Sequence, residues 1–454
     1  MDQSGGQQRV VNEYRLNEDN ELRLEVGRDE VILELLEGTA EIFGSQISMH
    51  KRYTLPPGFR AAVFTYKADA DGLGGAALFF LNVLYKLPAF IPFSIYSLFN
   101  LFPFQFILFL FNRPILSNHL LEHARRPRHF AKECRGPIDG RPKFDRSRPA
   151  TFNRRAHRRR QVDALSNSLD IGQGSVSIPG TIGCLYIEKP ADIVDGFDRK
   201  AAYVHNFGHI SPSANIRLYD LLVKELALAV RKKSKSSLVC DVSGFIVNTC
   251  GWVKGDGYAC IVNAAEAFEP DVVIVLDHER LYNELQQDLP SFVKILHLPK
   301  SGGVESRSQE IRTAGRRNAM HRYFYGTKSS PFYPHSFELS YDKAADEQEL
   351  LLAKVGAEQL PASCVPVGMV LEDHRTQVVP VPVGPQLLNH VLALMPPNSA
   401  IDQGLLKKPC IGFVVVTAVN AEKKSITLLS PQPYPLPTKV ALFSEVTFID
   451  DSNL

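Results

Sequence analysis

Short apolar runs alternate with long amphipathic stretches from residue 170 onward, and this alternation constrains the fold more than any other feature of the chain. The runs are GFIVNTCG, DVVIVLD and VKILHLP, and the stretch NIRLYDLLVKELALAVRKK has the spacing of a helix. A strand that is apolar at every position is buried on both faces, as in a parallel sheet covered by helices. We therefore predict an α/β domain with a central parallel sheet over residues 170–330.

The sequences on either side of this domain favour strands without helices. Residues 12–66 contain ELRLEV, EVILELLEGTAEIF and RAAVFTY, whose apolar and polar positions alternate between turns at GRD and PPG. The last hundred residues contain CIGFVVVTAVN, SITLLSP and KVALFSEVTFID. We expect an N-terminal β-sandwich-like domain over residues 1–72 and a C-terminal β-rich domain over residues 331–454.

Composition narrows the class of protein. A chain of 454 residues with 44% hydrophobic residues and a net charge of +2 is long and apolar enough for several packed domains, which excludes a disordered or fibrous class. Its seven cysteines form no CxxC pair, which argues against a zinc ribbon and favours a reducing compartment. The polar N-terminus predicts that there is no secretory signal peptide.

Residues 73–169 do not fit this organisation. From residue 87 to residue 111 the chain carries no charge and 16 Leu, Ile or Phe residues, which is long and apolar enough to span a bilayer. The same composition is expected from a translated intron, because Phe, Leu, Ile, Ser and Tyr have pyrimidine-rich codons. The segment is therefore either a membrane span or sequence foreign to the protein.

A basic segment follows the apolar one. Residues 112–161 contain 15 Lys or Arg against 4 Asp or Glu, and the run RRAHRRRQVDAL covers residues 154–165. One interpretation is a nucleic-acid-binding or nuclear-localisation patch. The alternative emerges from the motifs around it.

Outside residues 73–169 the chain resembles the polynucleotide 5′-hydroxyl kinase subunit of the pre-mRNA 3′-end cleavage factor. The resemblance rests on ELLEGTAEIFG, LDIGQGSVSIPGT, NTCGWVKGDGY, VVIVLDHERLYNEL, LPKSGGVESRS and HRYFYG, which occur in the family's order. It implies a P-loop kinase domain that transfers phosphate from ATP, with Mg²⁺, to the 5′-hydroxyl of RNA.

The family's phosphate-binding loop, GPTDVGKST, is missing from this chain. Codons for residues 155–165, read one base further on, can encode Gly-Pro-Thr-Asp-Val-Gly-Lys-Ser-Thr-Leu, although the third bases are free to choose. Only Ser-Asn-Ser then separates Leu165 from Leu169, where the family has a helix and a loop of some two dozen residues. We interpret residues 73–169 as an aberrant insert that replaces the Walker A region through a frameshift and a splice error.

The resemblance assigns chemistry to the residues that remain. Asp170 follows an expected apolar strand and corresponds to the Walker B carboxylate, which holds Mg²⁺ through water and activates the 5′-hydroxyl. Gln173 follows on the same turn and belongs to the ATP site. Arg307, Arg312 and Arg316 resemble the arginines of the lid over the transferring phosphate, and Arg312 and Arg316 are four residues apart on one helix face. Taken alone, a strand-end Asp is an ordinary turn residue and these arginines would form a solvated face.

Four further positions match the family's ligand contacts. Glu21 and Arg60 correspond to residues that grip the base and sugar of ATP. Thr249 and Trp252 correspond to the loop that clasps the substrate strand, where the chain's single tryptophan would stack on a base. Without the resemblance, Glu21 and Arg60 would be exposed strand residues and Trp252 a core residue.

Three hypotheses for the function follow. The first is a nuclear RNA 5′-kinase acting in pre-mRNA cleavage and polyadenylation, with tRNA splicing and its endonuclease as a second setting; as written, the chain would be inactive. The second is a non-catalytic scaffold that binds other cleavage and polyadenylation subunits. The third is a membrane-anchored variant, which requires that residues 87–111 belong to the protein.

Overall fold

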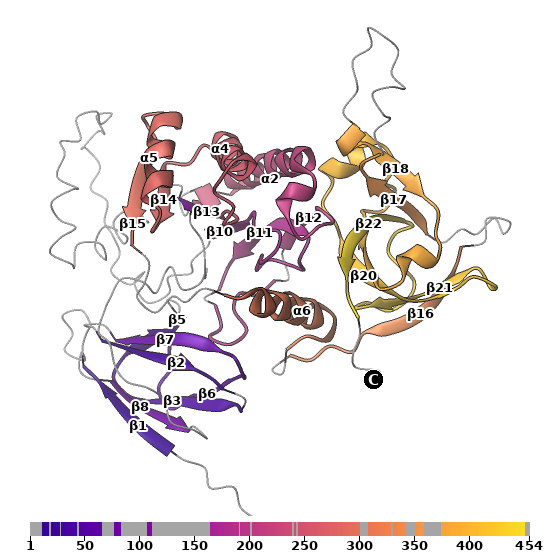
Figure 1. The fold of residues 1–454 in the computed structure, drawn as a ribbon. Helices are drawn as coiled ribbons and strands as arrows, with labels where there is room; N and C mark the ends of the chain where they lie inside the picture. Colours follow the sequence, from indigo (N-terminus) through magenta and orange to yellow (C-terminus); the bar gives the residue numbers. More distant parts are fainter. Residues whose placement is uncertain are drawn as a thin grey trace, which may run out of the picture.

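Three groups of elements follow one another along the chain: an N-terminal pair of sheets, a central α/β layer and a C-terminal sheet (Figure 1). The computed structural model describes residues 11–17, 20–27, 29–42, 45–65, 77–82, 107–110, 164–189, 191–199, 202–237, 240–241, 244–299, 307–327, 330–341, 350–357 and 374–449. The predicted architecture, a P-loop-kinase-like α/β domain between two β domains, is confirmed.

The N-terminal domain is a sandwich of two four-stranded antiparallel sheets, ordered β1-β8-β3-β6 and β2-β7-β4-β5. Its strands are β1 (Val11–Leu16), β2 (Glu21–Glu25), β3 (Val31–Glu37), β4 (Ala40–Ile42), β5 (Ser45–Gln46), β6 (Arg52–Leu55), β7 (Arg60–Thr65) and β8 (Ala77–Asn82). Alternate residues of β3, β6 and β7 are buried, as the alternating sequence predicts. Strand β8 lies between β1 and β3, so this sheet extends beyond the boundary expected at residue 72.

The central domain contains a seven-stranded sheet ordered β12-β11-β10-β13-β9-β14-β15. Its strands are β9 (Ile107–Leu110), β10 (Ala164–Ser168), β11 (Thr181–Ile187), β12 (Ala202–Asn206), β13 (Phe245–Asn248), β14 (Val272–Leu276) and β15 (Lys294–Leu298). Strands β10 and β13 are parallel, and so are β14 and β15. The parallel strands predicted from the three apolar runs are therefore present.

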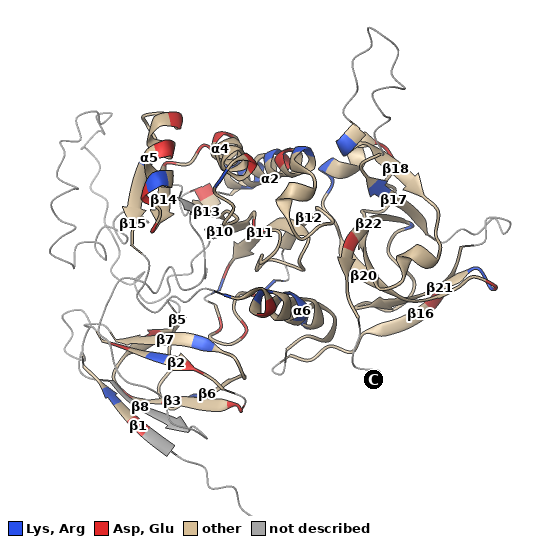
Figure 2. Cartoon of the chain, viewed as in Figure 1, with Lys and Arg blue, Asp and Glu red and all other residues tan. Residues whose placement is uncertain are grey.

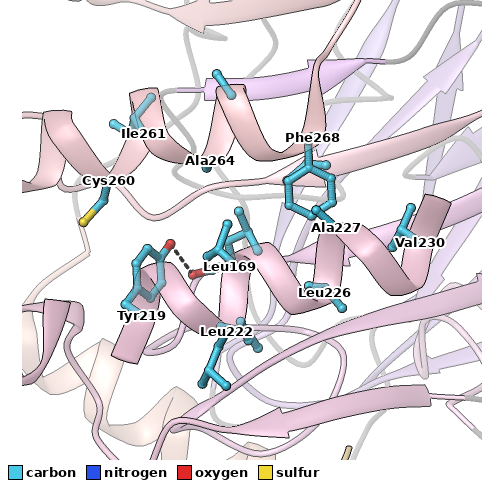
Figure 3. Packing of buried hydrophobic residues seen from close by; sticks show 14 of the residues in the cluster. Leu169, Tyr219, Leu222, Leu226, Ala227, Val230, Cys260, Ile261, Ala264 and Phe268 are labelled. Carbon is cyan, nitrogen blue, oxygen red and sulfur yellow. Dashed lines mark hydrogen bonds between the residues drawn. The ribbon is translucent and has the colours of Figure 1, made fainter. Parts of the chain in front are cut away.

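Helices α2 (Ile216–Ser236), α4 (Asp256–Phe268) and α5 (Glu279–Asp288) lie beside this sheet (Figure 1). Buried residues of α2 and α4 pack against one another and against β10, β13 and β14, as in the view of Figure 3. Asn215 caps α2 through a hydrogen bond from Leu218 N, and the buried side chains of α2 recur every three or four residues.

Strand β9 interrupts the parallel order. It lies between β13 and β14 and runs antiparallel to both, with Phe109 opposite Val247 and Val273. Residues 107–110 end the segment that we considered as a membrane span, and the rest of that segment lies outside the described residues. In the described part of the chain, no helix is long and apolar enough to cross a membrane.

Strand β10 differs from the expected apolar strand before Asp170. Its sequence is ALSNS, and Ser166, Asn167 and Ser168 are all buried. The strand is held by its pairing with β11 on one side and β13 on the other, so its backbone hydrogen bonds place polar side chains in the interior.

The C-terminal domain is a seven-stranded sheet ordered β16-β21-β20-β19-β22-β17-β18. Its strands are β16 (His335–Ser340), β17 (Leu351–Val355), β18 (Val378–Val381), β19 (His390–Leu394), β20 (Gly412–Asn420), β21 (Ser425–Ser430) and β22 (Val440–Thr447). Helix α6 (Gln309–Tyr325) precedes them and lies between the three domains (Figure 1). Its buried Met320 and Phe324 belong to the core of the C-terminal domain.

Candidate functional site

The candidate site lies at the edge of the central sheet where the parallel strands end. Asp170 follows β10, Thr249 follows β13 and Asp277 follows β14. The carboxyl ends of parallel strands meet at one edge of a sheet, and ligands of open α/β sheets bind outside that edge. The strand order therefore places Asp170 and Thr249 on neighbouring strands.

Asp170 is fixed in a tight turn. Its Oδ1 accepts hydrogen bonds from Gly172 N at 3.1 Å and Gln173 N at 3.0 Å. Burial raises the pKa of the Asp170 carboxyl, while these two N–H groups and the charge of Arg312 act in the opposite direction. A side chain at Gly174 would approach Asp170 O to 2.6 Å, so the turn requires glycine there.

Tyr219 supports the backbone immediately before Asp170, a role that no sequence pattern indicates. Its hydroxyl donates to Leu169 O at 3.1 Å, as the dashed line in Figure 3 marks. Tyr219 is fully buried on α2, and burial raises its pKa well above the ordinary value. In the sequence it occupies an apolar position of an amphipathic helix, which predicts a core residue only.

Helix α6 approaches the Asp170 turn from the opposite side. Gln173 Nε2 donates to Arg312 O at 3.4 Å, and a Cβ at Gly315 would lie 3.7 Å from Gln173 Oε1. The helix begins after Ser308, whose Oγ accepts from Ile311 N. Arg312 is therefore near Asp170, as the lid prediction requires, whereas Arg316 donates to Thr313 Oγ1 on its own helix.

Arg60 of the N-terminal domain lies near Arg307, which precedes helix α6. Burial lowers the pKa of Arg307, and the positive charges of Arg60 and Arg312 lower it further. Arg60, at the start of β7, also forms an ion pair with Glu25 at 2.5 Å. Figure 2 shows Lys or Arg positions on β7 and on α6, where the two elements face the central domain. Arginines from two domains thus lie close together, and Arg312 among them interacts with the Asp170 carboxylate.

Glu21 lies away from this cluster. It is buried on β2 and accepts a hydrogen bond from Arg23 Nε at 2.6 Å. In the β2–β7 pair, Glu21 is opposite Phe64 whereas Arg60 is opposite Glu25. Glu21 and Arg60 are therefore at opposite ends of the pair, about 13 Å apart along the strands. The structure does not bring these two predicted ATP contacts together.

The predicted substrate clasp lies between β13 and α4. Thr249 is 1% exposed, whereas Trp252 is half-buried in the loop. Trp252 packs on the first turn of α4, because a Cβ at Gly257 would clash with its backbone and its indole ring. Of the two residues, only Trp252 is accessible for stacking in this conformation.

Two histidines near the sheet edge have no catalytic assignment from the sequence. His205 is buried on β12, and burial lowers its pKa to about 4 against weaker backbone contacts with Leu406 and Lys408. Burial also lowers the pKa of the half-buried His209. Their positions between the central and C-terminal domains indicate packing.

Of the two implied cofactors, the described residues suit Mg²⁺ but not the phosphates of ATP. A carboxylate at the sheet edge is the kind of oxygen ligand that Mg²⁺ takes, so Asp170 suits that ion. A phosphate-binding loop instead leaves the carboxyl end of a strand and leads into a helix. Strand β9 runs the wrong way for this, since Ile107, where it begins, lies at the site edge and Leu110 lies at the other.

Unpaired polar atoms lie beside the same edge. Ser168 Oγ and Asn248 Oδ1 are buried without a hydrogen-bond partner among the described residues, and the two residues are register partners on β10 and β13. Within the described ranges, the edge offers no nest of backbone N–H groups for the ATP phosphates, and the basic run at residues 154–160 lies outside those ranges. The described residues alone therefore do not form a site for the ATP phosphates.

Comparisons with known families agree with the three-part fold. Residues 15–70 match the family described as the N-terminal beta-sandwich domain of polyadenylation factor. Residues 153–326 match mRNA cleavage and polyadenylation factor CLP1 P-loop, and residues 332–450 match pre-mRNA cleavage complex II protein Clp1.

Individual proteins are similar over nearly the whole chain. A protein CLP1 homolog of Brugia malayi is 48% identical, covering 98% of this chain and 97% of its own. A polyribonucleotide 5′-hydroxyl-kinase Clp1 of Xenopus tropicalis is 40% identical, covering 96% and 94%. A solved structure of Clp1p with Pcf11p, describing a point mutant that loses ATP, has a TM-score of 0.72 at 18% identity and covers 98% of this chain and 100% of that one.

Proposed function

Because this chain belongs to the Clp1 family of pre-mRNA cleavage and polyadenylation proteins, we propose that its central domain provides the site of an RNA 5′-hydroxyl kinase. The observation that carries the proposal is the approach of Arg312 to Asp170 at the carboxyl edge of the sheet, with Arg307 and Arg60 next in line beside Arg312. A cluster of this kind suits a phosphate group that passes beside a metal-binding carboxylate.

Each residue has a role in this proposal. Asp170 would hold Mg²⁺ and would accept the proton of the RNA 5′-hydroxyl, because its turn fixes the carboxylate at the edge. Arg307 and Arg312 stabilise the charge of the transferring phosphate, while Gln173 keeps α6 against the Asp170 turn. Trp252 stacks on a base of the RNA.

The chain as written lacks the loop that would hold the ATP phosphates, so we expect it to be inactive. Calorimetry of Mg-ATP with this chain tests that expectation. We predict no micromolar binding, because Arg60 and Asp170 reach only the periphery of a nucleotide. A micromolar Kd would show that residues outside the described ranges supply the missing contacts. Sequencing the transcript across codons 67–170 would establish whether a contiguous frame encodes GPTDVGKST.

A scaffold role is the second candidate function. It is favoured by the large apolar cores of the C-terminal domain, which is folded independently of the missing phosphate-binding loop. The similar solved structures are complexes of Clp1p with Pcf11p. We propose that this chain likewise binds a cleavage-factor subunit, and that it does so in the nucleus, where pre-mRNA 3′ ends are cut. Co-purification of such a subunit with a chain lacking kinase activity would support this role.

A further inference from the structure

We propose that Arg322 is a positioning residue which, through the loop of residues 191–196, holds the N-terminal sandwich and helix α6 in one fixed relation over Asp170. We call residues 191–196 the bridge loop. It lies in the connection between β11 and β12. The inference rests on the proposed function, because the arginines that it places are those of the kinase site.

The bridge loop is closed on itself. Asp192 Oδ1 accepts hydrogen bonds from Val194 N at 2.8 Å and Asp195 N at 3.0 Å. Asp192 and Gly196 also exchange two backbone hydrogen bonds at 2.8 and 2.9 Å. Gly196 has a φ of +71°, a conformation in which glycine is favoured. Internal bonds of this density make the loop a rigid block between its neighbours.

One side of the bridge loop belongs to the N-terminal domain. Ile193 is 5% exposed and lies in the apolar core of the sandwich, with Val194 packed beside it. Ser45 Oγ, on β5, donates a buried hydrogen bond of 2.6 Å to Ala191 O. The sandwich that carries Arg60 is therefore attached to the bridge loop by the buried Ile193 side chain and by the hydrogen bond from Ser45.

The other side of the bridge loop is bound by α6. The Arg322 guanidinium donates to Asp195 O and lies 3.7 Å from Asp195 Oδ1. Burial lowers the pKa of the nearby Arg199 to about 10, and the charge of Arg322 adds to this effect. This end of the helix is also fixed to the C-terminal domain, where Phe413 N donates to Tyr323 OH at 2.9 Å.

The opposite end of α6 carries the site. Arg312 is about 15 Å from Arg322 along the helix, and its carbonyl meets Gln173. A helix behaves as a rod over this length, so a change of tilt at Arg322 moves Arg312 relative to Asp170. Because Arg60 is seated by the same bridge loop, Arg322 sets the spacing between the arginines of both domains.

Hydrogen exchange of the full chain, read by mass spectrometry, tests the inference without requiring turnover. We expect Arg322→Ala to speed exchange about fivefold in the bridge loop, in residues 40–47 of the sandwich and in the Asp170 turn, since one charge-assisted bond is lost at their common support. Arg322→Lys keeps a charged donor and should restore most of the protection. Arg280→Ala, which removes an exposed pair with Glu284 on α5, is the matched control and should change none of these segments.

Ser45→Ala provides a test from the opposite side. It should speed exchange in the first turns of α6 as well as in the bridge loop, and it answers the question even if Arg322→Ala does not fold. Faster exchange confined to the bridge loop, or spread evenly over the chain, would overturn the inference. The outcome is separate from that of the kinase assay: a chain that never phosphorylates RNA could still show the coupling, and an active one could lack it.

Discussion

Replacing Asn167 by valine should make the central domain more stable. Asn167 is fully buried on β10, on the same face as Leu165 and Leu169, which belong to the apolar core of the domain. Its Nδ2 donates to Ile246 O at 3.0 Å, but its Oδ1 has no hydrogen-bond partner among the described residues. A buried strand of a helix-covered sheet normally carries an apolar residue at such a position.

The expected gain is about 2 kcal/mol in the free energy of unfolding. Removing an unsatisfied buried acceptor returns about 1–3 kcal/mol, and loss of the bond to Ile246 O removes about 1 kcal/mol. Valine adds a modest apolar contribution and has a high strand propensity. Asn167→Asp should act in the opposite direction, since it buries an unpaired charge.

Urea unfolding followed by tryptophan fluorescence measures this change. Trp252 is the only tryptophan and lies in the central domain, so its signal reports on that domain. Thr54→Val, on an exposed position of β6, is the control and should shift the midpoint very little. An unchanged or lower midpoint for Asn167→Val, with the same m-value, would refute the argument that β10 carries an unmet polar group.

Three further results are expected. Gly174→Ala should lower the melting temperature, because its Cβ would meet Asp170 O at 2.6 Å, whereas Gly27→Ala, with nothing within 4 Å, should not; equal effects would contradict the tight turn. Burial lowers the pKa of His205, so neutral His205 contributes stability above pH 6.5 and this contribution is lost as the pH falls toward 4. His205→Phe should therefore remove up to about 3 kcal/mol of the pH dependence of the free energy of unfolding. Parallel curves of unfolding free energy against pH for the two proteins would refute this. Trp252→Ala should weaken RNA binding by about 1–3 kcal/mol in a filter-binding assay while Trp252→Phe keeps most of the affinity, and equal binding by all three proteins would exclude stacking.

The strands that were predicted best are those whose own residues are apolar. GFIVNTCG and DVVIVLD become β13 and β14, whose burial requires apolar residues on both faces, whereas VKILHLP becomes β15, a partly exposed strand at the edge of the sheet. Strand β10 could not be predicted in this way. Its buried serines and asparagine carry no apolar signal, and its place follows from pairing with β11 and β13.

The candidate site was predictable in part. The position of Asp170 was predicted from the motif LDIGQGSVSIPGT, and that of Arg312 from a helix after a glycine pair. The approach of Arg60 to Arg307 joins residues of two domains, and no local pattern encodes it. The separation of Glu21 from Arg60 likewise depends on their register in the β2–β7 pair. The bridge loop shows no sequence signal, because its role depends on partners from two other domains.

The most direct test of the central claim is a 5′-end labelling assay with γ-labelled ATP, Mg²⁺ and a short RNA. It compares the chain as written with a chain in which GPTDVGKST and its helix replace residues 83–163, so that strand β8 of the N-terminal sheet is kept. We predict that the restored chain labels the RNA, that the chain as written does not, and that Asp170→Asn in the restored chain removes most turnover while leaving ATP binding largely intact. A restored chain that binds ATP but labels no RNA end would contradict the assignment of a kinase site and leave the scaffold role.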